Sequence, residues 1–181
     1  MEAKRSEKLL ILGIGNMLLA DEGVGVHAAQ ALKKKDMPEG VAVLDVGTAI
    51  LEALPELEQA DRVIVIDAVI AGKEAGTVYR IAYDDCERPE RIASMHGFDL
   101  SRVLAMTSRK LPPSIIVIGV EPARIEWSLE LSVPVAEALD VVLRTIESEL
   151  LTPPDPAVHV PGAHGLRQKE EDGEEAHGHE G

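Results

Sequence analysis

The chain has 181 residues, 45% hydrophobic but only 2% aromatic, which suits a single domain with an aliphatic core. Its 18 basic and 32 acidic residues give a formal net charge of −14, which argues against binding to nucleic acid or to an anionic membrane surface. The single cysteine excludes an intramolecular disulfide. Because the sequence shows neither a signal peptide nor an apolar run long enough to span a membrane, we expect a cytoplasmic protein.

The first predicted element is a buried strand at residues 8–14, which runs into a turn that contains two glycines. The turn resembles a nucleotide-binding loop. The dinucleotide motif, however, needs a third glycine where this chain has Leu18, and a P-loop needs a lysine that is missing here. Phosphate binding is therefore disfavoured. Two carboxylates follow, Asp21 and Glu22, and Asp21 is expected to cap the next helix.

The remaining elements alternate between helices and strands. Three further segments are rich in valine, isoleucine and leucine without alternation, as in parallel strands buried on both faces: 41–46, 62–68 and 114–120. The segment 77–82 alternates and is expected to be an antiparallel edge strand. Helices are predicted at 23–35, 100–109 and 133–150, the last two capped by Asp99 and Ser132. The pattern predicts an α/β three-layer sandwich, a mostly parallel twisted sheet of about five strands flanked by helices on both faces.

The composition changes after this last helix. Residues 152–181 hold four prolines, seven acidic residues and four histidines, with few large apolar side chains to offset the entropy of ordering. We therefore expect one folded domain, residues 1–151, followed by an acidic, histidine-containing disordered tail, residues 152–181.

Polar residues at the ends of the strands are the candidates for function, because parallel sheets bind ligands at the carboxyl ends of their strands. Glu22 follows the first strand, Asp45 lies in the second, Asp67 ends the third, and His96 precedes the helix that leads into the last. We expect Glu22, Asp67 and His96 to converge at one exposed crevice. Two carboxylates and an imidazole suit nickel, zinc or iron and leave coordination positions open.

Other catalytic schemes find little support. The chain has no Gly-x-Ser-x-Gly elbow, no His-Glu-x-x-His helix and no Cys-x-x-Cys pair. Cys86 sits among carboxylates, which disfavour a reactive thiolate. His27 lies five residues after Glu22 on a predicted helix, so it is expected to point elsewhere and to have no function.

Five segments match one family in order and spacing: GIGNMLLADEGVGV, LDVGTAILEAL, VIVIDAV, SMHGFDLSRVLAM and VIGVEP. From about residue 8 to residue 150 the chain resembles the nickel-iron hydrogenase maturation endopeptidases. The resemblance implies a mostly parallel sheet flanked by helices. It also implies an activity, the removal of a short C-terminal extension from the hydrogenase large-subunit precursor once nickel has been inserted.

The resemblance also implies roles for individual residues. The metal-binding positions of the family correspond here to Glu22, Asp67 and His96, which would recognise nickel already held by the precursor. Asp45 matches a family aspartate linked to cleavage or substrate positioning, and the substrate-binding positions beside it are Gly47 and Thr48.

The expected partner is thus the large-subunit precursor of a nickel-iron hydrogenase, with nickel as the metal and the chain itself a monomer. Two alternatives stay open. One is a non-proteolytic nickel-binding accessory protein, a metallochaperone that uses the same three residues. The other is an inactive relative that serves as an interaction module, against which the intact set of Glu22, Asp67 and His96 argues.

Overall fold

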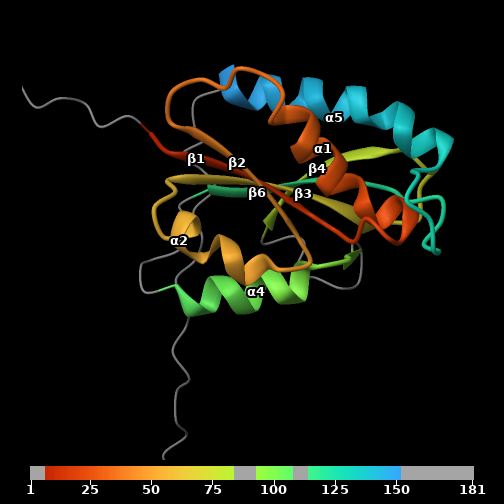
Figure 1. The fold of residues 1–181 in the computed structure, drawn as a ribbon, viewed down its shortest axis with the longest axis horizontal. Helices are drawn as coiled ribbons and strands as arrows, with labels where there is room; N and C mark the ends of the chain where they lie inside the picture. The colour runs from red at the N-terminus through yellow and green to blue at the C-terminus, as the bar shows by residue number, and fades with distance from the viewer. Residues whose placement is uncertain (1–6, 84–92, 108–113, 152–181) are drawn as a thin grey trace, which may run out of the picture.

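The computed structural model describes residues 7–83, 93–107 and 114–151 of the chain (Figure 1). The elements, in chain order, are β1 Leu9–Ile14, η1 Ala20–Gly23, α1 Val24–Leu32, β2 Val41–Gly47, η2 Ile50–Ala53, α2 Leu54–Leu57, β3 Arg62–Ile70, β4 Val78–Ala82, β5 Ala93–Ser94, α4 Gly97–Met106, β6 Ser114–Val120 and α5 Val133–Leu151. The tail predicted for 152–181 and Cys86 lie outside the described residues.

Strands of the described part of the chain form a six-stranded sheet in the order β2-β1-β3-β6-β4, with β5 paired to β3 off this path. The strands β2, β1, β3 and β6 are mutually parallel. At one edge β4 runs antiparallel to β6, as its alternating sequence predicted. The two-residue β5 adds a short antiparallel pairing to the end of β3, and it was not predicted.

Helices cover both faces of the sheet, so the predicted three-layer α/β sandwich is confirmed (Figure 1). Alternate residues of β3 face opposite layers: Ile64 and Ile66 pack with α1 and α5, whereas Val63 and Val65 pack with α2 and α4. Any residue one position further along a strand therefore faces the other layer of helices.

Helix α1 packs very closely on the sheet, and a glycine makes this possible. A Cβ atom on Gly25 would overlap the carbonyl oxygens of Ile14 and Ile66. A Cβ atom on Gly13 would in turn overlap the backbone of Gly25. The helix that follows the glycine turn is therefore held tightly against β1 and β3.

Helix boundaries differ from the prediction at several points. Helix α1 ends at Leu32 and not at residue 35, and α4 begins at Gly97, so Asp99 lies inside its first turn and does not cap it. The predicted α5 is confirmed. The short helices η2 and α2 were not predicted. Among the described residues no helix combines the length and the apolar character needed to cross a bilayer.

Candidate active site

The glycine turn after β1 positions Glu22. Gly15 has a φ of 139°, and a Cβ atom there would overlap the carbonyl oxygen of Glu22. The loop then turns back through η1, where the N–H of Glu22 donates to the carbonyl of Leu19 at 3.2 Å. Glycine at this position lets the backbone of the acidic residue lie directly over the end of the strand.

Asp67 is a fully buried carboxylate near the end of β3. It accepts hydrogen bonds from the backbone N–H of Ala68 at 2.8 Å and of His96 at 3.1 Å, and from the hydroxyl of Ser94. Its Oδ1 lies 2.9 Å from Nδ1 of the His96 ring. The pairing of β5 with β3 brings the donors of Ser94 and His96 over Asp67, so this carboxylate adds to the backbone pairing that attaches the segment before α4 to the sheet.

Glu22 completes the cluster from the other side of the imidazole. Its Oε1 lies 3.4 Å from Nε2 of His96, and the side chains of Glu22, His96 and Asp67 are 12%, 8% and 0% exposed. The expected convergence of the three residues is confirmed. The expectation of an exposed crevice is wrong, because the side chain of Asp67 is fully buried and that of His96 is only 8% exposed.

The environment of His96 favours the protonated ring. The hydrogen bond to Asp67 raises the pKa of His96 above 6.5; burial opposes this, and the charges of Asp67, Glu22 and Asp99 reinforce it. The ring is thus held between two carboxylates, with Nδ1 towards Asp67 and Nε2 towards Glu22.

Two carboxylates and an imidazole are a donor set that suits nickel or zinc. In the described part of the chain, however, no three His, Cys, Asp or Glu side chains are arranged to hold a metal ion. The oxygens of Asp67 are engaged in hydrogen bonds, while Nε2 of His96 and Oε1 of Glu22 face each other. A histidine that binds a metal through one ring nitrogen commonly donates the other to a carboxylate, as His96 does to Asp67. The types of ligand therefore suit a metal ion, but their present arrangement does not.

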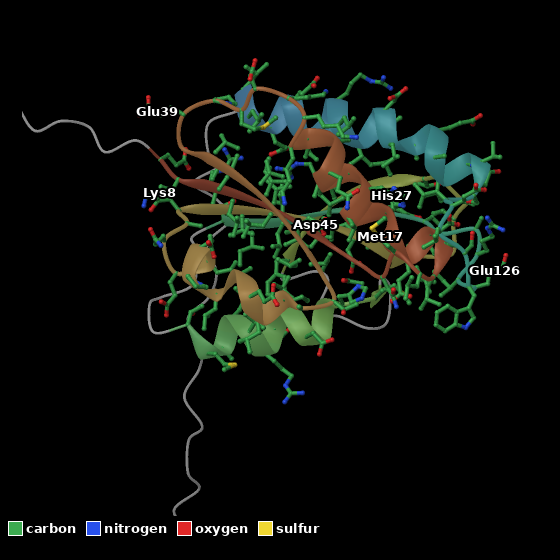
Figure 2. The ribbon with its side chains drawn as sticks, viewed as in Figure 1. Lys8, Met17, His27, Glu39, Asp45 and Glu126 are labelled. Carbon is green, nitrogen blue, oxygen red and sulfur yellow. The ribbon has the colours of Figure 1, made fainter. Side chains whose placement is uncertain are left out.

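Asp45 does not join this cluster. In the sheet register it lies opposite Gly13, which lies opposite Ile66, so Asp45 faces the α1 side of the sheet and Asp67 faces the α4 side. One oxygen of Asp45 accepts a hydrogen bond at 3.0 Å from Gln30 of α1. The amide of Gln30 also donates to the sulfur of Met17 at 3.6 Å. Figure 2 labels Asp45 and Met17.

Gly47 and Thr48 lie beyond Asp45, next to the glycine turn. The carbonyl of Gly47 accepts a hydrogen bond at 3.0 Å from the N–H of Gly15, and Thr48 is exposed. Gly47 has a φ of 54°, which favours glycine. The sheet register shifts here, because Asp45 lies opposite Gly13 but Gly47 lies opposite Ile14. Val46 is therefore an extra residue in β2, and it turns the chain across the end of β1.

His27 is confirmed as separate from the cluster, on α1 (Figure 2). Its Nε2 is buried and, among the described atoms, has no hydrogen-bond partner. Burial lowers the pKa of His27 below 6.5, against the opposing charge of Asp45.

Asp21 has a different role from the predicted helix cap. It is fully buried, and neither η1 nor α1 has a side-chain cap. Its carboxylate accepts hydrogen bonds from the N–H groups of Ala123 and Arg124 at 2.8 and 3.0 Å, and from the N–H and hydroxyl of Ser132 at 2.7 and 2.8 Å. Ser132 thus directs its hydroxyl to Asp21 at the start of α5, and the segment 122–132 is fixed beside the residue that precedes Glu22.

Comparison with known proteins identifies the family. Residues 26–149 match the family model described as hydrogenase maturation protease. The chain belongs to the hydrogenase maturation protease family. It is 33% identical over 164 residues to the hydrogenase 2 maturation protease of Escherichia coli, a match that covers 84% of this chain and 99% of the relative.

Two solved structures of maturation proteases share the fold. The hydrogenase maturating endopeptidase HybD from E. coli has a TM-score of 0.72 and 28% identity, covering 80% of this chain and 92% of HybD. The [NiFe] hydrogenase maturation protease HybD from Thermococcus kodakarensis has a TM-score of 0.67 and 26% identity, covering 78% and 98%.

Family membership confirms the resemblance seen in the sequence and makes the protein a hydrolase of the maturation protease type. The segment matched by the family model includes Asp45, Asp67 and His96 but begins after Glu22. Ser94 and Gln30, which contact Asp67 and Asp45, were not identified from the sequence. Ser94 lies in the matched segment SMHGFDLSRVLAM, two residues before His96, which is the one signal that could have pointed to it.

Proposed function

We propose that this maturation protease is an endopeptidase that removes a C-terminal extension from the large-subunit precursor of a nickel-iron hydrogenase after nickel insertion. Family membership supports the proteolytic activity. The T. kodakarensis relative, which is named a [NiFe] hydrogenase maturation protease, supports the class of hydrogenase. The observation that carries the proposal is the convergence of Glu22, Asp67 and His96 at the carboxyl end of the sheet.

Nickel in this proposal belongs to the substrate. The precursor holds the ion with its own cysteines, and Glu22, His96 and Asp67 recognise it, so that cleavage depends on metal loading. The hydrogen bond that Nδ1 of His96 makes to Asp67 holds the imidazole with Nε2 towards Glu22, which places a nitrogen ligand and an oxygen ligand side by side. Binding of nickel at Nε2 requires the neutral form of the ring, so recognition competes with protonation.

Asp45 is the proposed catalytic residue, with Gly47 and Thr48 binding the substrate backbone beside it. Its backbone lies two strands away from that of Asp67, about 10 Å at the usual strand spacing, and the two side chains face opposite sides of the sheet. A peptide that reaches both residues crosses the end of β1, where Gly13 and Gly15 have no side chains. Asp45 would orient the water that attacks the scissile bond. Asp45→Asn should then abolish cleavage without preventing precursor binding.

The direct test incubates the protein with nickel-loaded precursor and follows the mass of the precursor. We expect loss of a C-terminal peptide from the loaded precursor and none from the nickel-free form. Efficient cleavage of the nickel-free form would refute nickel recognition while leaving the peptidase activity intact. An unchanged mass together with transfer of nickel would support the metallochaperone instead.

A further inference from the structure

The segment between β6 and α5 exposes large apolar side chains. Ile125, Trp127, Leu129 and Val133 are 39%, 81%, 64% and 72% exposed, and Trp127 is the only tryptophan of the chain. Leu18, in the loop before η1, is 50% exposed. Contiguous exposed apolar side chains on a folded protein commonly mark a binding surface, and tryptophan is over-represented where interfaces are strongest.

Backbone hydrogen bonds hold the loop before η1 against the segment that carries the other exposed apolar side chains. The N–H of Ser128 donates to the carbonyl of Leu18 at 3.0 Å, and the N–H of Ala20 donates to the carbonyl of Ser128 at 2.8 Å. Leu19 and Ser128 form a parallel bridge, so Leu18 lies on the same side of this pairing as Trp127 and Leu129. We call Leu18, Ile125, Trp127, Leu129 and Val133 the apolar loop surface.

The apolar loop surface is held in place from beneath. The four hydrogen bonds to the buried carboxylate of Asp21 fix both ends of the segment 122–132. Above them, the guanidinium of Arg124 donates to Glu126 and to the carbonyl of Glu130, at 2.9 and 3.3 Å. The exposed apolar side chains are therefore carried by an ordered loop with a charged rim, an arrangement that lowers the entropy cost of binding a partner.

The apolar loop surface is continuous with the candidate site. Asp21, which fixes the loop, is followed directly by Glu22, and Leu18 belongs to the turn that carries Glu22. Figure 1 shows the connection from β6 to α5 beside η1 at one end of the molecule, and Figure 2 labels Glu126 at the same end. Because the side chains of Glu22 and His96 are only 12% and 8% exposed, a protein that presents an ion to them must cover the surface around η1.

We infer that the apolar loop surface docks the folded body of the hydrogenase large-subunit precursor, next to the point where its metal meets Glu22 and His96. This inference rests on the proposed function. The docked precursor buries Trp127 and Leu129 at the centre of the contact, while Arg124, Glu126 and Glu130 form the polar rim. A stable protein–protein contact covers about 800 Å² on each partner, more than five side chains supply, so the contact extends from the loop over η1 to the site.

The test compares the double variant Trp127→Ser/Leu129→Ser with Val141→Ser, a matched change at a 41% exposed apolar residue in α5. For the nickel-loaded precursor we expect the double variant to raise both KM and Kd at least about tenfold, with kcat and the melting temperature unchanged. The control variant should leave all four quantities unchanged.

An unchanged Kd in the double variant would overturn the docking surface. If the wild-type protein binds the precursor but does not cleave it, the proposed function is refuted. The Kd of the double variant for the precursor would still show whether the apolar loop surface is the docking surface. Sedimentation of the wild-type protein alone gives a further control. A dimer that the double variant abolishes would assign this surface to a second copy of the chain and would also overturn the inference.

Discussion

Removal of the Asp67 carboxylate tests whether the site is held together as its hydrogen bonds indicate. In Asp67→Ala the backbone N–H groups of Ala68 and His96 lose their buried acceptor, and so do the hydroxyl of Ser94 and the ring of His96. The hydroxyl and the ring can rotate towards other partners, but the two backbone groups are fixed by β3 and by the start of α4.

Each buried N–H left without a partner costs about 1–3 kcal/mol, and relief from burying a carboxylate offsets part of the sum. We therefore expect Asp67→Ala to lower the free energy of unfolding by about 3 kcal/mol. For a domain of this size the melting temperature would fall by about 6–12 °C. Glu22→Gln should change the free energy by less than about 1 kcal/mol, since glutamine keeps the size of the side chain and the nearest charged partner of Glu22 is 3.4 Å away.

The assay measures urea unfolding and precursor processing on the same samples, at a temperature where each variant is folded. Both variants should abolish processing, but only Asp67→Ala should be clearly destabilised. A loss below about 1 kcal/mol for Asp67→Ala would show that the four contacts do not hold the site together. Normal processing by Glu22→Gln would remove Glu22 from the proposed nickel-recognising set.

Four further predictions concern the scaffold and the histidines. Glu149→Gln should cost about 2–3 kcal/mol in urea unfolding because two arginines pair with this buried carboxylate, whereas Glu147→Gln, at an exposed ion pair, should cost less than about 0.5 kcal/mol. Gly25→Ala should cost at least about 3 kcal/mol, seen as a lower melting temperature, because its Cβ atom would overlap two backbone carbonyls. The hydrogen bond to Asp67 raises the pKa of His96, so the stabilisation by the protonated ring is complete below 6.5 and is lost as the pH rises through the raised pKa. The stability difference between wild type and His96→Gln should therefore shrink as the pH rises above 6.5. Burial lowers the pKa of His27, so the sign is opposite, and His27→Leu should gain stability relative to the wild type as the pH falls below 6.5.

The strands of the sheet could be predicted because burial on both faces leaves a strong signal. β3 and β6 are nearly continuous runs of valine and isoleucine, and both faces of each pack against helices. The order of the strands in the sheet could not be predicted from the sequence, because each of the four apolar strands could pair with any of the others. β5 has two residues and pairs with the end of a strand far away in the sequence, so neither its length nor its composition gives a pattern.

At the site, the three residues that come together could be predicted from the sequence, but the hydrogen-bond partners of the acidic residues could not. Glu22, Asp67 and His96 follow strand ends or precede a helix in a parallel sheet, and that placement alone brings them to one edge. The role of Asp21 depends on donors that lie 102 to 111 residues away. A short polar side chain at the start of a helix is usually a cap, so the local sequence favoured the wrong role for Asp21.

The two faces of the sheet explain why the glycine turn lies at the centre of the site. Asp45 and Asp67 are both on strands next to β1, but the register places Asp45 on the α1 side and Asp67 on the α4 side. Side chains that face opposite layers can act on one substrate only above the edge of the sheet, where the strands end. β1 lies between them, and its Gly15 leaves room there for the backbone of Glu22. In a nucleotide-binding protein such a turn leaves space for a phosphate. In this chain the same space admits the backbone of Glu22, and we propose that the glycine turn lets a substrate peptide pass from the metal-recognising residues to Asp45.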